Sequence, residues 1–393
     1  MSNYDQAIGL LERSLSKSGY LASPSNVTNY RRIWSRDGII CGLAAMLSSD
    51  TELILGFRQT LITLGAAQTE LGHIPSNVAI TDGGMPAQVS LGGIAGRADT
   101  IAWWILGVCN YAHFANEPSF AYRYKAQIDL GLRLMRCWEY NNKGLMYVPQ
   151  SGDWADEYVL HGYVLYDQAL RLCALQAYTL AFGDAQAGEQ AANLKNLLKT
   201  NYWIDKATPN PDLYHARAYE LAPELPYFAA ALTPGGYAAQ FDSLANALCI
   251  LAGVADAAQT QSIADYVQKT SSNLGLGLMP AFFPPIMPNE PGWLELQNNY
   301  KYEFRNLPHE FHNGGTWAMT NGFLGAALCK SGFSAQATQI LASIESINQV
   351  EDWGFYENFN TQTQKPIGTK YCAWSAAAQI ILQNYLTQNY LLF

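Results

Sequence analysis

Apolar residues recur at helical spacing along the whole chain, and this pattern constrains the fold more than any other feature. We expect helices at residues 4–17, 36–48, 51–69, 98–115, 119–139, 163–183, 187–201, 238–253, 256–272, 314–331, 333–347 and 371–387. The helices alternate between two kinds. Those beginning near 36, 98, 163, 238, 314 and 371 are rich in Ala, Gly, Leu, Ile and Cys, whereas their partners carry charged and polar residues on one face.

A helix that is apolar on all sides must be buried, and an amphipathic helix lies outside it. The alternation therefore predicts an all-α fold, an (α/α)6 barrel of inner and outer helices, with residues 1–393 forming a single domain. An α-solenoid would show a repeated sequence unit, and the sequence contains none.

The connections between these helices alternate as well. Some are short turns, but those at 70–97, 140–162, 202–237, 273–313 and 348–370 are long and rich in Gly, Pro and aromatic residues. Loops this long in a compact domain are usually functional. In an (α/α)6 barrel they emerge at one end, where we expect them to build a cleft.

Composition excludes several classes of protein. Charged residues make up only 14% of the chain against 49% hydrophobic ones, so the chain is not disordered. The net charge of −9 and the absence of basic clusters argue against nucleic acid as a partner. Apolar runs such as 100–110 are too short to cross a membrane. The seven cysteines are scattered and form no CxxC pair, which predicts reduced core residues and a cytoplasmic protein without a secretory signal.

The N-terminal half contains two segments in which charged residues begin an apolar helix. In the first, YRRIWSRDGII at 30–40, Arg36 and Asp37 either charge and cap the helix or hydrogen-bond a polar ligand at a cleft floor, flanked by Tyr30 and Trp34. In the second, GRADTIAWWI at 96–105, Asp99 follows Arg97 and precedes Trp103 by one turn. Asp99 is either a helix cap or a catalytic acid in an aromatic pocket.

Two further segments place acids or a histidine among aromatic residues. SGDWADEY at 151–158 runs into HGYVLYDQAL at 161–170, and EFHNGGTW at 310–317 precedes WGFYENFN at 353–360. From these segments and the last helix we select Asp153, Trp154, Asp156, Glu157, Tyr163, Asp167, Gln168, His312, Asn313, Trp317, Trp353, Glu357 and Trp374. Nothing near the acids supplies a convincing set of metal ligands, so we expect no metal and no cofactor.

Acids in long loops, together with 10 Trp and 24 Tyr, suit carbohydrate chemistry. Hydrolysis of a glycoside with inversion requires one carboxyl that protonates the leaving oxygen and a second carboxylate that activates water on the opposite face of the sugar. The sequence offers candidates for both, and the expected partner is a small carbohydrate. The oligomeric state is not encoded in any pattern that we recognise.

These segments, in this order, resemble the clan of (α/α)6 glycoside hydrolases that contains the alkaline/neutral invertases, the amylo-α-1,6-glucosidases and the processing-glucosidase and mannosylglycerate-hydrolase relatives. The resemblance covers residues 30–386 and rests on IWSRDGII, GHIPSNVAI with GRADTIAWWI, DWADE with GYVLYDQALRLCAL, FDSLANALCILAG, FHNGGTWA, and FYENFNTQTQKPIG before YCAWSAA. The chain departs from the clan pattern at Asp167, Ala318 and Cys372, and Glu357 lies two residues further from its Trp than in the invertases.

The resemblance implies that Asp99 is the general acid and Glu357 the general base of an inverting hydrolase, with the other selected residues lining the sugar subsite. It also implies an α-glucoside as substrate, sucrose being the alternative that the invertases suggest. Two other classes remain open. A sugar 2-epimerase uses the same barrel but works through histidines, and a non-catalytic carbohydrate-binding protein would bind sugar without turnover.

Overall fold

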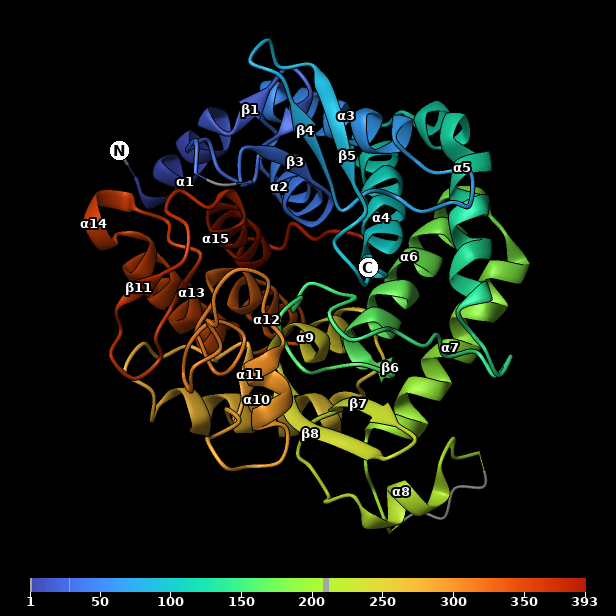
Figure 1. Ribbon diagram of the computed structural model, residues 1–393. Helices are drawn as coiled ribbons and strands as arrows, with labels where there is room; N and C mark the ends of the chain where they lie inside the picture. The colour runs from blue at the N-terminus through green and yellow to red at the C-terminus, as the bar shows by residue number, and fades with distance from the viewer. Residues whose placement is uncertain (1, 28, 208–211) are drawn as a thin grey trace.

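The computed structural model describes residues 2–27, 29–207 and 212–393, and six helices in it form a closed inner ring. Each helix of the ring packs on the next, and the last packs on the first. In chain order they are α2 (Ser35–Ser48), α4 (Asp99–Phe114), α6 (Leu165–Phe182), α9 (Ser243–Leu251), α12 (Ala318–Lys330) and α15 (Ala373–Leu386). Figure 1 shows these helices around the centre of the molecule.

The amphipathic helices lie outside this ring (Figure 1). They are α1 (Asn3–Arg13), α3 (Thr51–Ala66), α5 (Pro118–Cys137), α7 (Ala185–Tyr202), α10 (Ala257–Ser271) and α13 (Ser334–Asn348). The all-α (α/α)6 barrel predicted from the sequence is therefore confirmed. Within the described residues, no helix combines the length and the hydropathy needed to cross a bilayer.

Small residues let the helices of the ring approach their neighbours closely. A Cβ on Gly42 of α2 would meet the Phe57 ring of α3 at 1.8 Å, and a Cβ on Gly322 of α12 would lie 2.6 Å from Cβ of Ala378 in α15. Every residue of α9 is buried. The Gly- and Ala-rich composition of these helices thus follows from their crowded position.

The long connections contain short helices and strands that the sequence did not reveal. The helices are α8 (Ala216–Leu221), α11 (Trp293–Asn298) and α14 (Val350–Trp353). The strands form two hairpins, β1 (Leu15–Ser16) with β2 (Gly19–Tyr20) and β10 (Asn358–Phe359) with β11 (Pro366–Ile367), and two antiparallel sheets. The sheets are β3 (Arg32–Trp34), β4 (Asn77–Ile80) and β5 (Pro86–Ser90), and β6 (Tyr163–Val164), β7 (Ala229–Thr233), β8 (Gly236–Asp242) and β9 (Phe282–Phe283).

The expectation of a helix from 238 was wrong over its first turn, because β8 occupies residues up to Asp242 and α9 begins at Ser243. The sequence TPGG at 233–236 joins β7 to β8 as a hairpin, a turn signal that the helical reading of the Ala-rich flanks overlooked. The first and tenth expected helices were also too long. α1 ends at Arg13, and α12 begins only at Ala318.

Candidate active site

The N-terminal turns of the ring helices bring together residues that are far apart in the sequence. Arg36 and Asp37 lie in the first turn of α2, Asp99 begins α4, and Asp167 lies in the first turn of α6. Asp242 caps α9 through a hydrogen bond from the backbone N–H of Ala245. The positive end of a helix dipole stabilises a nearby carboxylate, which helps explain how so many acids lie inside the barrel.

Asp99 is completely buried and held by side chains from both neighbouring ring helices. Nη1 of Arg36 donates to both carboxylate oxygens at 3.3 Å, and the hydroxyl of Tyr166 in α6 donates to Oδ2 at 3.0 Å. Asp37 lies close enough to sense the charges of both Asp99 and Glu357, and burial raises its pKa to about 7. Asp37 therefore lies near both of the expected catalytic carboxylates.

Glu357 lies just before β10 and is 4% exposed. The Tyr30 hydroxyl donates to Oε1 at 2.5 Å, and the backbone N–H of Thr369 donates to Oε2 at 3.3 Å. Burial raises the pKa of Glu357, while the Tyr30 hydrogen bond and the positive charge of Arg305 oppose that shift. A carboxylate with a raised pKa in a dry setting has the properties of a general base.

The loop at 151–158 carries two ion pairs to the rim of this cluster. Asp156 accepts from Nη2 of Arg97 at 2.5 Å, and although burial acts to raise the pKa of Asp156, the Arg97 charge holds it below its usual value. Glu157 pairs with Arg305, whose Nη2 lies 3.0 Å from Oε1. Arg97 also donates to three backbone carbonyls, so the loop is fixed in place.

Aromatic rings form a compact group beside these acids. The ring of Trp154 stacks on Phe282 at 5.9 Å and meets His312 and Trp317 edge-on at 5.1 and 5.5 Å. His312 stacks on Trp317, and burial lowers the pKa of His312 to about 3, so its imidazole is neutral at neutral pH. Trp374 of α15 packs on Trp317. Rings and acids side by side are the usual lining of a sugar site.

The sequence of this chain is similar to those of known invertases. The model of the alkaline and neutral invertase family matches residues 221–389. Neutral/alkaline invertase 3, a chloroplastic protein of Oryza sativa subsp. japonica, is 22% identical over 92% of this chain and 68% of its own length. Probable alkaline/neutral invertase D of Arabidopsis thaliana is 22% identical over 94% of this chain and 78% of its own length.

Solved structures share the fold at lower sequence identity. The mannosylglycerate hydrolase of Thermus thermophilus superposes with a TM-score of 0.71 at 14% identity, covering 97% of this chain and all of that chain. A bacterial glucoamylase gives a TM-score of 0.67 at 17% identity, covering all of this chain and 56% of its own. The resemblance to the (α/α)6 glycosidase clan is therefore confirmed. The chain is a glycoside hydrolase.

Several residues selected from the sequence serve the scaffold of the hydrolase. Gln168 exchanges two hydrogen bonds with the backbone of Met146, and Asn313 exchanges two with the backbone of Ile286. Trp34 donates its indole N–H to the Asn29 carbonyl, and Tyr163 packs on Tyr147 and Tyr214 and hydrogen-bonds Asn141. The ring of Trp353 packs on Phe355 and against the main hydrophobic core. The contacts of these side chains that the described residues show thus go to backbone groups, other rings and an amide rather than to the carboxylates.

Asp153 and Asp167 lie deeper, near Asp99. Oδ1 of Asp153 accepts from the Ala155 N–H, and burial raises its pKa to about 7. Both Asp167 oxygens are buried and have no hydrogen-bond partner within the part of the chain that the structure describes, and burial raises the pKa of this carboxyl well above its ordinary value. Among the described residues, no group of three or more His, Cys, Asp and Glu side chains could hold a metal ion.

Sequence reasoning missed four residues of the hydrolase site, namely Tyr166, Asp242, Phe282 and Arg305. Asp242 shows the same signal that singled out Asp99, an acid directly before a strongly apolar helix. Tyr166 directly precedes Asp167, in the first turn of the same helix. Phe282 and Arg305 lie in a long loop whose path no local pattern specifies.

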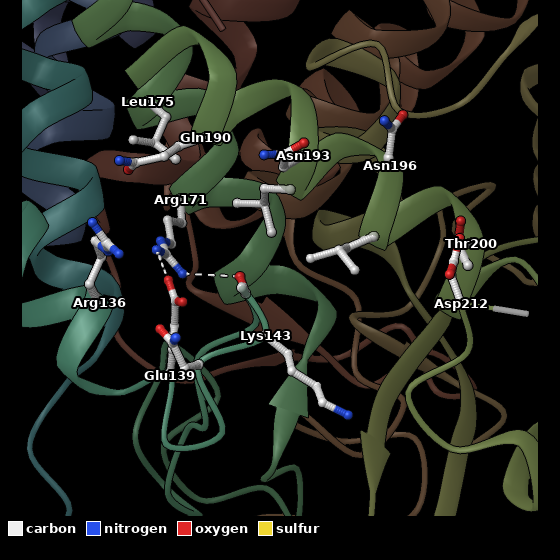
Figure 2. Close-up of a pocket in the computed structure, with 14 residues that line it drawn as sticks. Arg136, Glu139, Lys143, Arg171, Leu175, Gln190, Asn193, Asn196, Thr200 and Asp212 are labelled. Atoms are coloured by element: carbon white, nitrogen blue, oxygen red, sulfur yellow. Dashed lines mark hydrogen bonds and ion pairs between the residues drawn. The ribbon is translucent and has the colours of Figure 1, made fainter. Parts of the chain in front are cut away.

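A large cavity of about 660 Å³ lies away from these carboxylates, between α5, α6 and α7. Figure 2 shows its charged lining, where Arg171 points at Glu139 and the two side chains form a buried ion pair. Arg171 also donates to the Gly144 carbonyl. The charges of Arg171 and Glu139 therefore neutralise each other, which makes this cavity a weaker candidate for the active site than the carboxylate cluster.

Proposed function

We propose that the protein is an inverting glycosidase in which Asp99 is the general acid and Glu357 the general base. The observation that carries the proposal is that two buried carboxylates far apart in the sequence, Asp99 and Glu357, both lie near Asp37 in one cluster lined by aromatic rings. Each carboxylate also accepts a tyrosine hydrogen bond. The pair of acids suits glycoside hydrolysis in general, and inversion is supported by the resemblance to the (α/α)6 clan.

In the proposed reaction Asp99 gives its proton to the glycosidic oxygen as the bond from that oxygen to the anomeric carbon breaks. Glu357 takes a proton from a water molecule whose oxygen bonds to the anomeric carbon from the opposite face. Arg36 stabilises the carboxylate that Asp99 becomes, because its Nη1 contacts both oxygens. The Tyr30 hydroxyl orients Glu357 toward the water.

The remaining cluster binds the sugar that is cleaved. Asp37, Asp153 and Asp156 offer carboxyl oxygens to sugar hydroxyls, and Trp154 supplies a ring surface beside the neutral His312. A buried polar site rejects a sugar that lacks a matching hydroxyl, because its own groups are then left unpaired. Selectivity for one sugar is the expected consequence.

A small α-glucoside is the substrate that we propose. The two catalytic candidates are almost completely shielded from solvent, since Asp99 is 0% and Glu357 4% exposed. Such a site suits a short ligand better than a polymer. The structural neighbours include a bacterial glucoamylase solved with acarbose and a relative solved with glucose. Sucrose is the second candidate, favoured by the invertase family match over residues 221–389.

We also propose a cytosolic location. All seven cysteines are free and six of them are buried, which suits a reducing compartment. Measuring the protein in fractionated cells of its source would test this, and enrichment in a plastid fraction would contradict it.

Proton NMR of the protein incubated with α-glucosides, including sucrose and glucosylglycerate, tests the function directly. We expect β-glucose to appear first from one of them. Asp99→Asn and Glu357→Gln should each lower kcat on that substrate by roughly 100-fold to 10,000-fold, with Asp129→Asn, at the surface of α5, as the control. Initial release of α-glucose, or near-normal turnover by either variant, would contradict the proposed roles.

A further inference from the structure

The hydroxyl of Tyr166 lies in a chain of hydrogen bonds whose direction is fixed. The indole N–H of Trp103 donates to this hydroxyl at 2.8 Å, and an indole nitrogen has no acceptor capacity. The Tyr166 oxygen is therefore the acceptor of that bond. Its own hydrogen points to Oδ2 of Asp99, 3.0 Å away. The chain thus runs from Trp103 through Tyr166 to Asp99.

The three members of this chain are rigidly placed. Asp99 and Trp103 lie one turn apart on α4, so their side chains lie on the same face of that helix. Tyr166 comes from the first turn of the adjacent ring helix α6. All three side chains are completely buried, and the Trp103 ring is also packed against Phe323. Water does not compete for these hydrogen bonds.

Tyr166 keeps its proton at neutral pH. Burial raises the pKa of the Tyr166 hydroxyl well above its ordinary value, and the Asp99 charge acts in the same direction. The hydroxyl therefore remains a donor to Asp99 throughout the neutral range. Arg36 contacts both oxygens of the Asp99 carboxyl at the same distance of 3.3 Å, so the Tyr166 hydroxyl is the donor that distinguishes Oδ2 from Oδ1.

We propose that Tyr166, oriented by Trp103, is a positioning residue for acid catalysis, which holds Oδ2 of Asp99 as an acceptor and leaves the transferable proton on Oδ1. This inference rests on the proposed role of Asp99. When the Oδ1–H bond breaks and its proton moves to the glycosidic oxygen, the negative charge left on Asp99 is shared between both oxygens. The Tyr166 hydrogen bond strengthens as that charge develops, so it acts on kcat more than on KM.

Two substrates that differ in whether their leaving group must be protonated can isolate the role of Tyr166 in acid catalysis. An α-glucoside with an alcohol leaving group requires acid catalysis, whereas fluoride leaves from α-glucosyl fluoride without protonation. We expect Tyr166→Phe to lower kcat on the glucoside about 10-fold to 100-fold and to change hydrolysis of the fluoride less than about 3-fold. Tyr20→Phe, which removes a buried hydroxyl bonded to the Leu53 carbonyl in another part of the barrel, is the matched control.

Asp99→Asn separates failure of this inference from failure of the proposed function. Selective loss of glucoside hydrolysis in Asp99→Asn supports its role as the acid, and equal loss on both substrates refutes that role. If Asp99→Asn is selective but Tyr166→Phe slows both substrates alike, Tyr166 is merely structural and our inference is overturned. Trp103→Phe keeps an aromatic side chain but removes the N–H donor. It should also slow the glucoside more than the fluoride, by a smaller factor than Tyr166→Phe. This variant gives a second test if Tyr166→Phe does not fold.

Discussion

The carboxyls of the cluster lie at the mouth of the barrel, where the ring helices begin. They differ in the donors that surround them, and this difference decides which of them are charged. The Arg97 charge holds the pKa of Asp156 below its usual value, whereas burial raises that of Asp153 to about 7 and that of Asp167 well above its ordinary value. A carboxyl without a donor is costly to ionise in a dry interior. At neutral pH the site therefore contains both charged and protonated carboxyls, as acid–base catalysis requires.

At the residue scale, Gly368 limits the position of Glu357. A Cβ built on Gly368 would lie 2.4 Å from Oε2 of Glu357, and the residue has a φ of +79°. We expect Gly368→Ala to displace the Glu357 carboxylate and lower kcat by about 10-fold or more, while the positive φ costs about 1 kcal/mol of stability. Steady-state kinetics together with a urea unfolding curve measure the two effects.

Gly332→Ala is the matched control for this prediction. Gly332 also has a positive φ of +96°, but a Cβ there meets nothing within 4 Å. Its alanine variant should lose similar stability and keep full activity. Equal activity in the two variants would show that Glu357 tolerates displacement, which is inconsistent with its proposed role as the base.

At the scale of elements, the site is assembled where the ring helices begin, and the sequence revealed this only in part. Asp99 and Arg36 could be predicted because a charged residue at the start of an apolar helix stands out from its surroundings. Arg305 could not, since its importance comes from Glu157 and from Phe311, whose ring lies 3.9 Å below the guanidinium. Gln168 was misleading because polar residues in a buried helix also bind loop backbone.

The positive charge of Arg305, in a long loop, lowers the pKa of Glu357 against the effect of burial, which raises it. Removing the positive charge in Arg305→Gln should raise the pKa of Glu357 further, because Arg305 opposes the shift caused by burial. A general base is inactive when protonated, so the acidic limb of kcat/KM should move to higher pH, by roughly half a unit to one unit.

Two control variants accompany the measurement of that pH profile. Arg305→Lys keeps the charge and should leave the acidic limb close to its original position. Arg217→Gln breaks an exposed ion pair with Glu220 and should leave it unchanged. A limb that stays fixed in Arg305→Gln, or moves to lower pH, would show that Arg305 does not act on the base.

At the scale of the whole molecule, the ring helices separate a polar mouth from an apolar far end. The C-terminal segment packs at that far end, where Leu392 exchanges two backbone hydrogen bonds with the side chain of Asn110 and Phe393 contacts Phe323 (Figure 1). Stability therefore comes from the closed ring and its apolar end, while the mouth contains acids that oppose folding when they are charged. This division predicts that the pH dependence of stability comes from the acids at the mouth of the barrel.

Asp242 offers the simplest test, because one of its oxygens caps α9 and the other is buried without a hydrogen-bond partner from the described residues. Burial raises its pKa from 3.8 to about 7 in the folded protein. The folded state thus binds this proton more tightly than the unfolded state. Stability should therefore fall as pH rises from about 3.8 to about 7 and change little through this group above that range. Asp242→Asn keeps the cap but carries no charge, so it should be more stable than the original protein at pH 8, by no more than roughly 4 kcal/mol. At pH 5 the gain should shrink to roughly 1.6 kcal/mol, because the Asp242 carboxyl is then ionised in the unfolded state only. Thermal unfolding at both pH values measures the difference, with Asp184→Asn at the cap of the outer helix α7 as the control. If Asp242→Asn gave no gain at pH 8 beyond that seen at pH 5, the acids at the mouth would not be what limits stability in alkaline solution.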